Sequence, residues 1–501
     1  MNISDAKELI KNTVEIYLEK DKHGCFVIDP SKQRPIFLLG APGIGKTAIM
    51  EQVSQELGIP LVSYSLTHHT RQSALGLPFI KEVTYDGKEY SISEYTMSEI
   101  IASIYDVREK TGMNQGILFI DEINCVSETL YPSMLQFLQF KTFGKFKVPD
   151  DWIIVTAGNP SEFNDSAKEF DVVILDRLKK AEIKPDFKAW KDFALANNTH
   201  PAIMAFLELH KDYFYKIETT VDGKQLATAR GWSDLSNIIY AYEKHFLKVD
   251  INLISQYIQH KKIAREFHSY YDVYKKYEKK YDVEKIINGK WGNDVITKLQ
   301  ASPFDERYAL LSILLSRLNT DFNDIYVQDQ TMDELLKTLK PYVMKLKSQD
   351  INIHDEIQAS ISRLRKEIQV KKEGNYLSKI EFLKKTETIN LLEKDLTKLD
   401  PSLNGAKNFE IVKEEFNKEY KEMFDYSTKI KEYLSNSFKF VNEAFGENNE
   451  MVIFLSELSV NYYSSLFIAK YGCDEYKQYS SLLNFHDRKV KIIEDIKNNK
   501  A

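Results

Sequence analysis

Eight consecutive residues near the N-terminal end of the chain have the composition of a phosphate-binding loop. Glycine backbones can turn N–H groups toward phosphate oxygens, and a lysine ammonium can contact the β- and γ-phosphates. A threonine hydroxyl can bind Mg²⁺, and the N-terminal end of the following helix favours an anion. The alternative is a glycine-rich turn without a ligand. The pattern is G-x-x-x-x-G-K-[ST], and the residues predicted to bind ATP and Mg²⁺ are Gly40, Ala41, Pro42, Gly43, Ile44, Gly45, Lys46, Thr47 and the following Ala48.

Two adjacent acids follow an apolar run farther along the chain. Asp121 and Glu122 come directly after Gly116-Ile-Leu-Phe-Ile, a run that predicts a buried strand. Asp121 could hold Mg²⁺ opposite Thr47, and Glu122 could act as the general base that polarises the attacking water. An Asp-Glu pair also ends many ordinary strands. Its position downstream of a phosphate-binding loop favours the catalytic interpretation.

Two polar residues in later segments are further candidates for contact with a nucleotide. Asn159 follows the apolar run 152–157 in a Gly-Asn-Pro sequence, and it could orient the lytic water or contact the γ-phosphate. Gly-Asn-Pro also forms simple turns. Arg230 lies at the start of a predicted helix for which Ser233 is a plausible cap. Arg230 could contact the nucleotide and report its state, or it could merely pack against its own helical domain.

One arginine is a candidate for a contribution across a subunit boundary. Arg177 follows Asp176, and such a pair is more often a surface ion pair that contributes little to stability. Its place after the strand that bears Asn159 suggests that the Arg177 side chain reaches the γ-phosphate bound by a neighbouring subunit. An arginine supplied in this way raises the hydrolysis rate by on the order of 10³–10⁵-fold. Arg71 and Lys179 are weaker candidates for this role.

The elements needed to position these residues are those of an α/β domain. An amphipathic helix is predicted over 3–20, capped by Ser4 or Asp5. Apolar runs separated by helical stretches indicate a parallel sheet. The predicted strands are 36–39, 61–66, 117–120, 152–157 and 172–175.

The distribution of proline divides the chain into a part with frequent turns and a part with long helices. Ten of the thirteen prolines lie at or before Pro201, and the strands are expected to stop after Pro185. Ile353, Ile357, Ile361, Leu364 and Ile368 have the spacing of one helical stripe, which predicts packed core. The predicted domains are an α/β nucleotide-binding domain (1–185), a small helical lid (186–268) and a helical C-terminal domain of unknown role (269–501).

Composition excludes several classes of protein. The 501 residues carry a formal net charge of -6, which argues against a protein that coats nucleic acid or an anionic membrane. Cys25, Cys125 and Cys473 lack metal-ligand spacing, so reduced thiols in a cytoplasmic protein are expected. The sequence contains no run of about 18 apolar residues, so no membrane-spanning helix is expected. The N-terminal sequence does not resemble a secretory signal.

A hairpin is predicted between the second strand and the two acids. Asp86-Gly87 is flanked by alternating apolar residues, which is a hairpin signal. Leu77 and Phe79, before this hairpin, are candidates for contact with a protein partner, although Phe79 could equally pack beneath the hairpin. His68 and His69 have no companion ligand at metal-binding spacing and are interpreted as loop residues.

Taken together, the segments GAPGIGKT, ILFIDEIN, IVTAGNP, Asp176-Arg177 and the sequence around Arg230 resemble an AAA+ ATPase, and more narrowly the MoxR-like branch. The resemblance covers about residues 30–265 and implies that Asn159 is sensor 1, Arg177 the arginine finger and Arg230 sensor 2. Members often have proline before the sensor 2 arginine, where this chain has Ala229. The resemblance also implies a hexameric ring with ATP at subunit boundaries, and remodelling of a protein partner, commonly one with a von Willebrand factor A domain.

The leading hypothesis is therefore an ATP hydrolase that acts as a chaperone or remodeller. One alternative is a nucleotide-controlled scaffold with slow turnover, for which the C-terminal helices recruit partners. Another is a DNA-translocating or restriction-associated AAA+ motor. The acidic charge balance and the lack of a basic stripe interleaved with aromatic residues speak against this motor.

Overall fold

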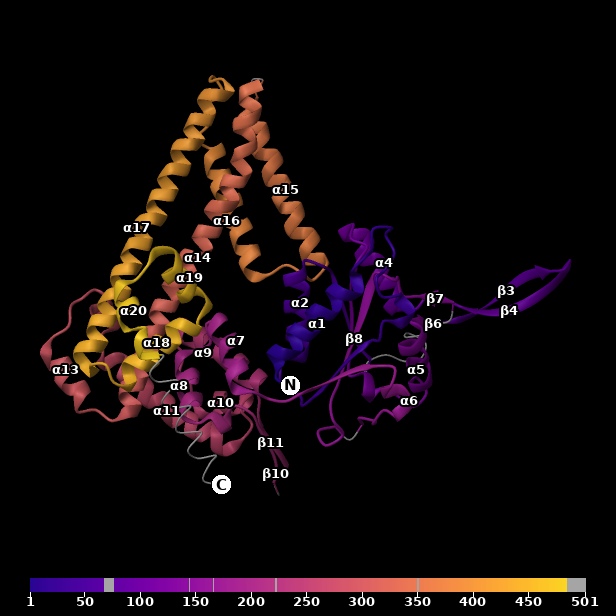
Figure 1. Cartoon of the computed structure of the whole chain (residues 1–501), viewed down its shortest axis with the longest axis horizontal. Helices are drawn as coiled ribbons and strands as arrows, with labels where there is room; N and C mark the ends of the chain where they lie inside the picture. The colour runs from indigo at the N-terminus through magenta and orange to yellow at the C-terminus, as the bar shows by residue number, and fades with distance from the viewer. Residues whose placement is uncertain (67–75, 144, 165, 221–222, 349–350, 484–501) are drawn as a thin grey trace. The chain divides into compact units, whose positions relative to one another are not determined.

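The computed structural model describes residues 1–66, 76–143, 145–164, 166–220, 223–348 and 351–483. The chain forms two compact units (Figure 1). The first unit contains Met1–Ala189 together with Ser362–Phe382, and the second contains Trp190–Ile361 together with Leu383–Ala501. A short segment of the helical region therefore belongs to the α/β unit.

A parallel five-stranded sheet is the centre of the first unit, in the order β2-β5-β8-β1-β9. Strand β8 lies between β1 and β5, and the carboxyl ends of parallel strands meet at one edge. The polar residues that follow these three strands are thus brought together at that edge. The strands are β1 (Ile36–Gly40), β2 (Leu61–Ser65), β5 (Gly116–Asp121), β8 (Trp152–Gly158) and β9 (Lys179–Ile183).

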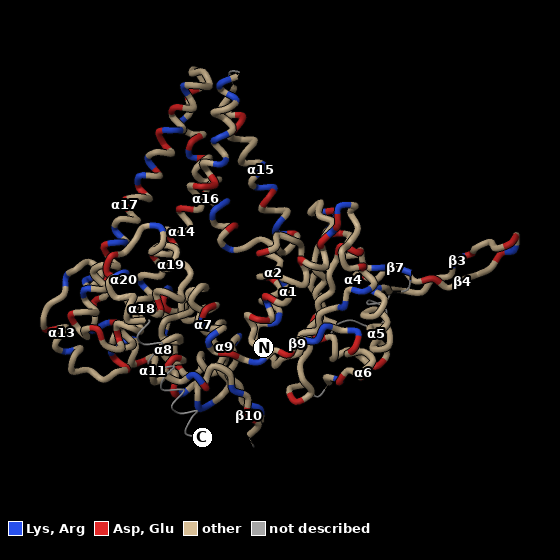
Figure 2. Tube along the Cα trace, in the orientation of Figure 1, with Lys and Arg blue, Asp and Glu red and all other residues tan. Residues whose placement is uncertain are grey.

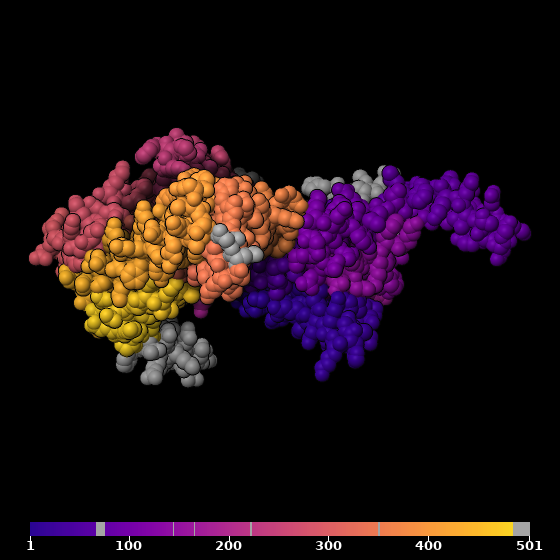
Figure 3. Space-filling view, turned by 90° about the horizontal axis from the view of Figure 1, so that it is seen from above, coloured from indigo at the N-terminus to yellow at the C-terminus, as the bar shows by residue number. Residues whose placement is uncertain are grey.

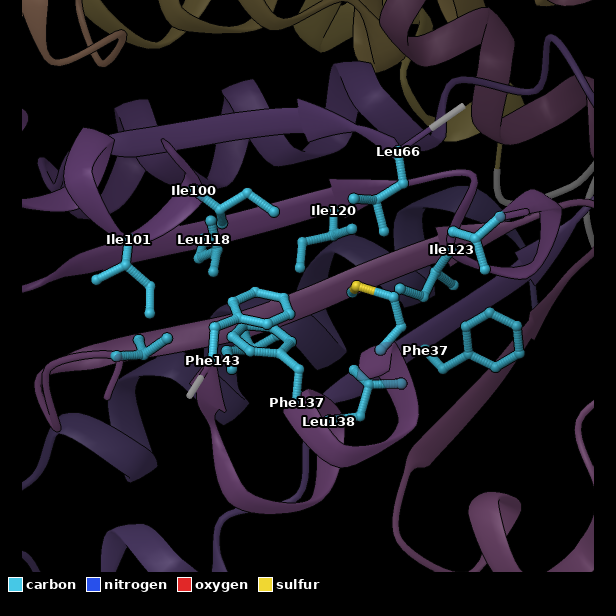
Figure 4. Close-up of a cluster of buried hydrophobic side chains, with 14 of the residues drawn as sticks. Phe37, Leu66, Ile100, Ile101, Leu118, Ile120, Ile123, Phe137, Leu138 and Phe143 are labelled. Atoms are coloured by element: carbon cyan, nitrogen blue, oxygen red, sulfur yellow. The ribbon is translucent and has the colours of Figure 1, made fainter. Parts of the chain in front are cut away.

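Helices cover the sheet and bury its apolar side chains. One cluster of buried residues includes Phe37, Leu118 and Ile120 from the strands (Figure 4). The rings of Phe137 and Phe143 stack within it, with centroids 4.2 Å apart. Burial of this kind stabilises the sheet by about 1.5–3 kcal/mol for each large apolar side chain. The helices of this unit are α1 (Ile3–Leu18), α2 (Lys46–Leu57), α4 (Glu99–Thr111), α5 (Tyr131–Phe140) and α6 (Val172–Leu175), with the 3₁₀ turns η1 (Pro30–Lys32) and η3 (Ile123–Cys125).

Two details of this unit differ from the sequence-based expectations. The run 172–175 forms helix α6 rather than a strand, because the Asp171 carboxylate caps it by accepting the Ile174 N–H at 2.8 Å. Val172 and Val173 are exposed, so the run is not buried as a strand would be. The cap of α1 is Asn2 rather than Ser4 or Asp5, and Asp5 completes a capping box with it.

The predicted hairpin is confirmed. Strands β3 (Pro78–Tyr85) and β4 (Lys88–Tyr95) pair antiparallel, and Asp86 and Gly87 have positive φ angles of 49° and 76°. These angles are those of a tight two-residue turn. The ribbon extends away from the body of its unit, and nearly all of its side chains are exposed (Figures 1 and 3). A shorter hairpin pairs β6 (Thr142–Phe143) with β7 (Phe146–Lys147).

The second unit is mostly helical, as expected, but strands do not stop after Pro185. β10 (Lys216–Thr220) and β11 (Gly223–Ala227) form an antiparallel ribbon. Its residues are mainly polar, and Ile217 and Leu226 pair with each other, so no apolar run marks these strands in the sequence. The remaining elements are η4 (Lys211–Tyr213), α7 (Phe187–Ala196), α8 (Pro201–Leu209), α9 (Ala229–Lys244), α10 (Ile251–Tyr257), α11 (Lys261–Lys280), α12 (Val283–Ile287), α13 (Asn293–Gln300), α14 (Phe304–Ser348), α15 (Ile353–Glu373), α16 (Lys379–Leu396), α17 (Gly405–Phe445), α18 (Asn449–Val460), α19 (Tyr462–Tyr471) and α20 (Asp474–Tyr479).

The C-terminal part contains two very long helices, α14 with 45 residues and α17 with 41. Acidic and basic residues are interspersed along them (Figure 2), as on a solvated helix surface. The stripe predicted in α15 is largely confirmed, because its first four members are buried and Ile368 is half-buried. Within the described residues no single helix is both long and apolar enough to cross a membrane, whereas α18 and α19 pass that test only as a pair bent by 89°.

The end of α15 returns to the α/β unit and docks on its edge strand. The main-chain oxygen of Gly374 accepts a hydrogen bond from the Leu61 N–H at 2.9 Å. The Asn375 side chain donates to the Leu61 oxygen at 3.3 Å. This corner between α15 and α16 therefore occupies both main-chain groups of the first residue of β2, which would otherwise lie open at the sheet edge.

Candidate active site

The loop between β1 and α2 has the backbone geometry of an anion site. Gly45 is the N-cap residue of α2 with φ of 100°, and it provides no side-chain cap for the helix. A Cβ at Gly40 would lie 2.7 Å from the Ile44 side chain and 2.9 Å from the Ile183 oxygen, so the loop excludes any larger residue there. Uncapped N–H groups at the positive end of a helix favour a bound phosphate.

The ammonium group of Lys46 is held by groups from two strands. Its Nζ donates to the oxygens of Gly40 and Ala41 at 2.7 and 2.9 Å. It also donates to Oδ1 of Asn159 at 2.9 Å, and Lys46 is only 8% exposed. The structure thus brings the predicted phosphate-binding lysine and the predicted sensor asparagine, far apart in sequence, into direct contact.

The two predicted Mg²⁺ ligands also meet. The Thr47 hydroxyl donates to Oδ2 of Asp121 at 3.0 Å. Hydroxyl and carboxylate oxygens are the hard ligands that Mg²⁺ prefers, and the ion usually takes its remaining ligands from phosphate and water. No group of three or more His, Cys, Asp or Glu residues in the described parts of the chain could hold a metal by itself. The pair therefore fits Mg²⁺ that arrives with a nucleotide.

Glu122 is fixed by the turn that follows β5. It has a left-handed φ of 55°, and its N–H donates to Oδ1 of Asp121 at 2.9 Å. Such a conformation is uncommon for a residue with a side chain and costs on the order of 1–3 kcal/mol. The Ser65 hydroxyl donates to Oε2 of Glu122 at 3.1 Å. Ser65 had no signal in the sequence, and only the pairing of β2 with β5, which places it opposite Asp121, reveals it.

Asn124 is a second residue that the sequence analysis did not identify. It lies in η3, directly after the two acids, and is 3% exposed. Its Nδ2 donates to the main-chain oxygen of Asn159 at 2.8 Å. Its own main-chain oxygen accepts the Lys168 N–H at 2.8 Å. Asn124 thus connects the acidic segment, the end of β8 and the segment that leads to α6.

Arg177 lies between α6 and β9 on an exposed segment, and its guanidinium donates to Gln139 of α5. The adjacent Asp176 forms only a loose pair with Arg34, with 3.8 Å between nitrogen and oxygen. Burial lowers the pKa of the nearby Lys141 to about 8. These cations line one surface cavity of about 600 Å³, whose charged residues are Lys32, Arg34, Lys141, Lys147, Asp176 and Arg177.

The other candidates differ in how the structure places them. Arg230 is exposed in the first turn of α9 in the second unit, and its contact with a nucleotide stays a prediction. The cap of α9 is Thr228, which accepts the Gly231 N–H at 3.2 Å, whereas the Ser233 hydroxyl donates to a main-chain oxygen within the helix. The Lys179 ammonium donates to the Thr13 hydroxyl at 2.6 Å. The weaker candidate Arg71 lies outside the described residues, as do His68 and His69, which are interpreted as loop residues.

A comparison with known protein families matches part of the chain. The sequence model of the family described as "ATPase family associated with various cellular activities (AAA)" matches residues 36–174. This range begins with β1 and ends within α6, so it contains the phosphate-binding loop, both acids, Asn124 and Asn159. Arg177, Arg230 and the C-terminal helices lie beyond it. The search of curated proteins found no match.

Proposed function

Because residues 36–174 are an ATPase domain of the AAA+ type, we propose that this chain hydrolyses Mg-ATP and uses the energy to remodel a protein partner. The observation that carries the proposal is the convergence at one sheet edge of Lys46 on Asn159 and of Thr47 on Asp121. These two contacts join residues from three separate strand ends. They bring together a cation, an amide, a hydroxyl and a carboxylate, which are the groups that bind a triphosphate and its metal.

Each of these residues has a defined task in hydrolysis. The loop N–H groups and Lys46 hold the phosphates, and Thr47 and Asp121 would hold Mg²⁺, which neutralises charge on the phosphates when bound. Glu122 accepts a proton from the attacking water. Asn159 orients that water or contacts the γ-phosphate from its position beside Lys46.

The test of hydrolysis compares three proteins. Wild type should turn over ATP, Glu122→Gln should bind ATP but lose turnover, and Lys46→Ala should lose nucleotide binding. Removal of a general base costs about 10²–10⁴ in rate. A nucleotide-controlled scaffold, the alternative, would bind ATP and show little change on Glu122→Gln. Salt-dependent binding to DNA would instead favour the DNA-associated motor.

The proposal extends to a ring of the MoxR-like type, hexameric, in which Arg177 of one subunit serves the next. Its support is that Arg177 is exposed and lines a cavity rich in cations, as a surface that meets a neighbour's phosphates would require. Subunits with Arg177→Ala, mixed with subunits carrying Lys46→Ala, should recover part of the turnover, because each mutant supplies what the other lacks. Absence of recovery in mixed assemblies would reject this placement.

The partner would contact the β3–β4 hairpin, and a protein with a von Willebrand factor A domain is the proposed class of client. Leu77 is 55% exposed, Phe79 42% and Ile80 78%, and an isolated two-stranded ribbon gains stability by packing against another surface. Phe79→Ala should impair remodelling and leave basal hydrolysis near normal. Thr84→Ala, on the opposite face of the same strand, is the matched control. Capture of a partner on Glu122→Gln in ATP would identify the client.

A further inference from the structure

Asn124 connects three segments of the proposed catalytic edge through one buried side chain. Its Nδ2 lies 2.8 Å from the main-chain oxygen of Asn159 and 3.5 Å from that of Lys168. Both partners are acceptors, so the side-chain nitrogen must be the donor in each contact. Asn124 is 3% exposed, so water cannot readily replace these hydrogen bonds.

The packing around Asn124 leaves its side chain little freedom. A Cβ added to Gly158 would lie 2.4 Å from Oδ1 and 2.9 Å from Cγ of Asn124. The amide therefore rests directly against the last residue of β8, the residue before Asn159. Because Asn124 follows Glu122 by two positions in a 3₁₀ turn, it ties the end of β8 to the segment that bears the acids.

We propose that Asn124 is a positioning residue that sets the place of the Asn159 side chain relative to Lys46 and Glu122. The hydrogen bond to the Asn159 oxygen fixes the main chain from which that side chain extends. The Asn159 amide then reaches the Lys46 ammonium, at 2.9 Å. The inference rests on the proposed function, because its consequence is a rate of ATP hydrolysis.

The expected effect is confined to turnover. Without the Asn124 Nδ2 donor, the main-chain oxygens of Asn159 and Lys168 each lose this hydrogen bond, and Asn159 loses its fixed position. Asn124→Asp keeps the side-chain size and removes the donor, and Asn124→Ala removes the donor without adding charge. Both should lower kcat by about tenfold or more, while the Kd for ADP stays within about twofold of wild type because Lys46 keeps its contacts with the Gly40 and Ala41 oxygens of the loop.

The decisive experiment is a double-mutant cycle with Asn159→Ala in the full-length chain. If Asn124 acts through Asn159, then Asn124→Asp should change kcat by less than about twofold in the Asn159→Ala background. Asn408→Ala is the matched control, since Asn408 is 8% exposed and its Nδ2 donates to the main-chain oxygens of Asp400 and Leu403 in the second unit, at 2.9 and 3.2 Å. It should leave kcat near the wild-type value.

The outcomes separate this inference from the proposed function. Equal losses in kcat from Asn124→Asp in both backgrounds, or a loss of ADP binding in both single variants, would overturn the positioning role. Thermal unfolding of each variant shows that a loss in kcat does not come from a smaller folded fraction. A wild-type chain with no ATP turnover would overturn the proposed function itself, and this inference with it.

Discussion

The substitution Gly158→Ala tests the same edge of the sheet from the opposite side. The added Cβ would lie 2.4 Å from Oδ1 of Asn124 and 3.1 Å from the ring of Phe37, whereas ordinary contacts begin at 3.4 Å. Asn124 must therefore move by about 1 Å, which is enough to break its 2.8 Å hydrogen bond to the Asn159 oxygen. Overpacking of this kind costs about 1–3 kcal/mol of folding free energy.

The catalytic consequence is larger than the loss of stability suggests. A displacement of about 1 Å in a positioning group can cost up to about 10²-fold in rate, so kcat should fall between about tenfold and 100-fold. Steady-state ATP turnover under conditions where the variant is fully folded, as shown by thermal unfolding, measures this effect directly.

A matched control comes from the other end of the same sheet. Gly116→Ala would place a Cβ 2.7 Å from the ring of Trp152, so it strains buried packing to a similar degree. Gly116 begins β5 and Trp152 begins β8, at the ends of the strands remote from Asp121 and Asn159. This variant should unfold more easily and yet keep its kcat. Wild-type turnover in Gly158→Ala, or equal loss in both variants, would refute the reasoning.

Three further predictions concern other parts of the molecule. Burial, together with nearby carboxylates, raises the pKa of Asp395 from 3.8 to about 7. Between these pH values the folded chain keeps the proton on Asp395, whereas the unfolded chain releases it. The free energy of unfolding therefore falls as the pH rises through this range. Asp395→Asn should stabilise the fold by on the order of 4 kcal/mol at pH 8 and hardly at all at pH 3, as followed by thermal unfolding. A maleimide at pH 7 should label the exposed Cys25 first, because burial raises the pKa of Cys473 to about 11, and Cys25→Ser should remove the fast phase. Asn375→Gly allows the same left-handed backbone but removes the side-chain donor to the Leu61 oxygen. It should speed amide hydrogen exchange at the start of β2, whereas the control Asn390→Gly should not.

The grouping of the candidate residues at one sheet edge could be predicted because it follows simple rules of chain geometry. The phosphate-binding loop has a local pattern, and the strand before each polar residue is a buried apolar run. Once the sheet is parallel, the ends of such strands must meet, which is why Lys46 and Asn159, and Thr47 and Asp121, come into contact. The expectation of a parallel sheet within an α/β domain, followed by a mostly helical region, is therefore confirmed.

Two of the misses, Ser65 and Asn124, have a common cause, which is that the informative contact is not local. Ser65 ends a strand without any pattern of its own, and the order of the strands alone brings it to Glu122. Asn124 gives no signal until the 3₁₀ turn directs its amide to Asn159. The run 172–175 differs for a local reason: Asp171 caps an exposed turn of helix, and four apolar residues in a row do not distinguish a short helix from a strand.

The structure also assigns a structural task to part of the helical region, for which the sequence offered none. An edge strand presents unpaired main-chain groups, and β2 is the edge strand next to β5. The corner after α15 supplies partners for both main-chain groups of Leu61, while at the other end of the same five-residue strand Ser65 contacts Glu122. The α/β unit is consequently not a contiguous stretch of sequence. A fragment that stops before Ser362 would lose the cover on β2, so the whole chain is the proper object for measuring the ATPase.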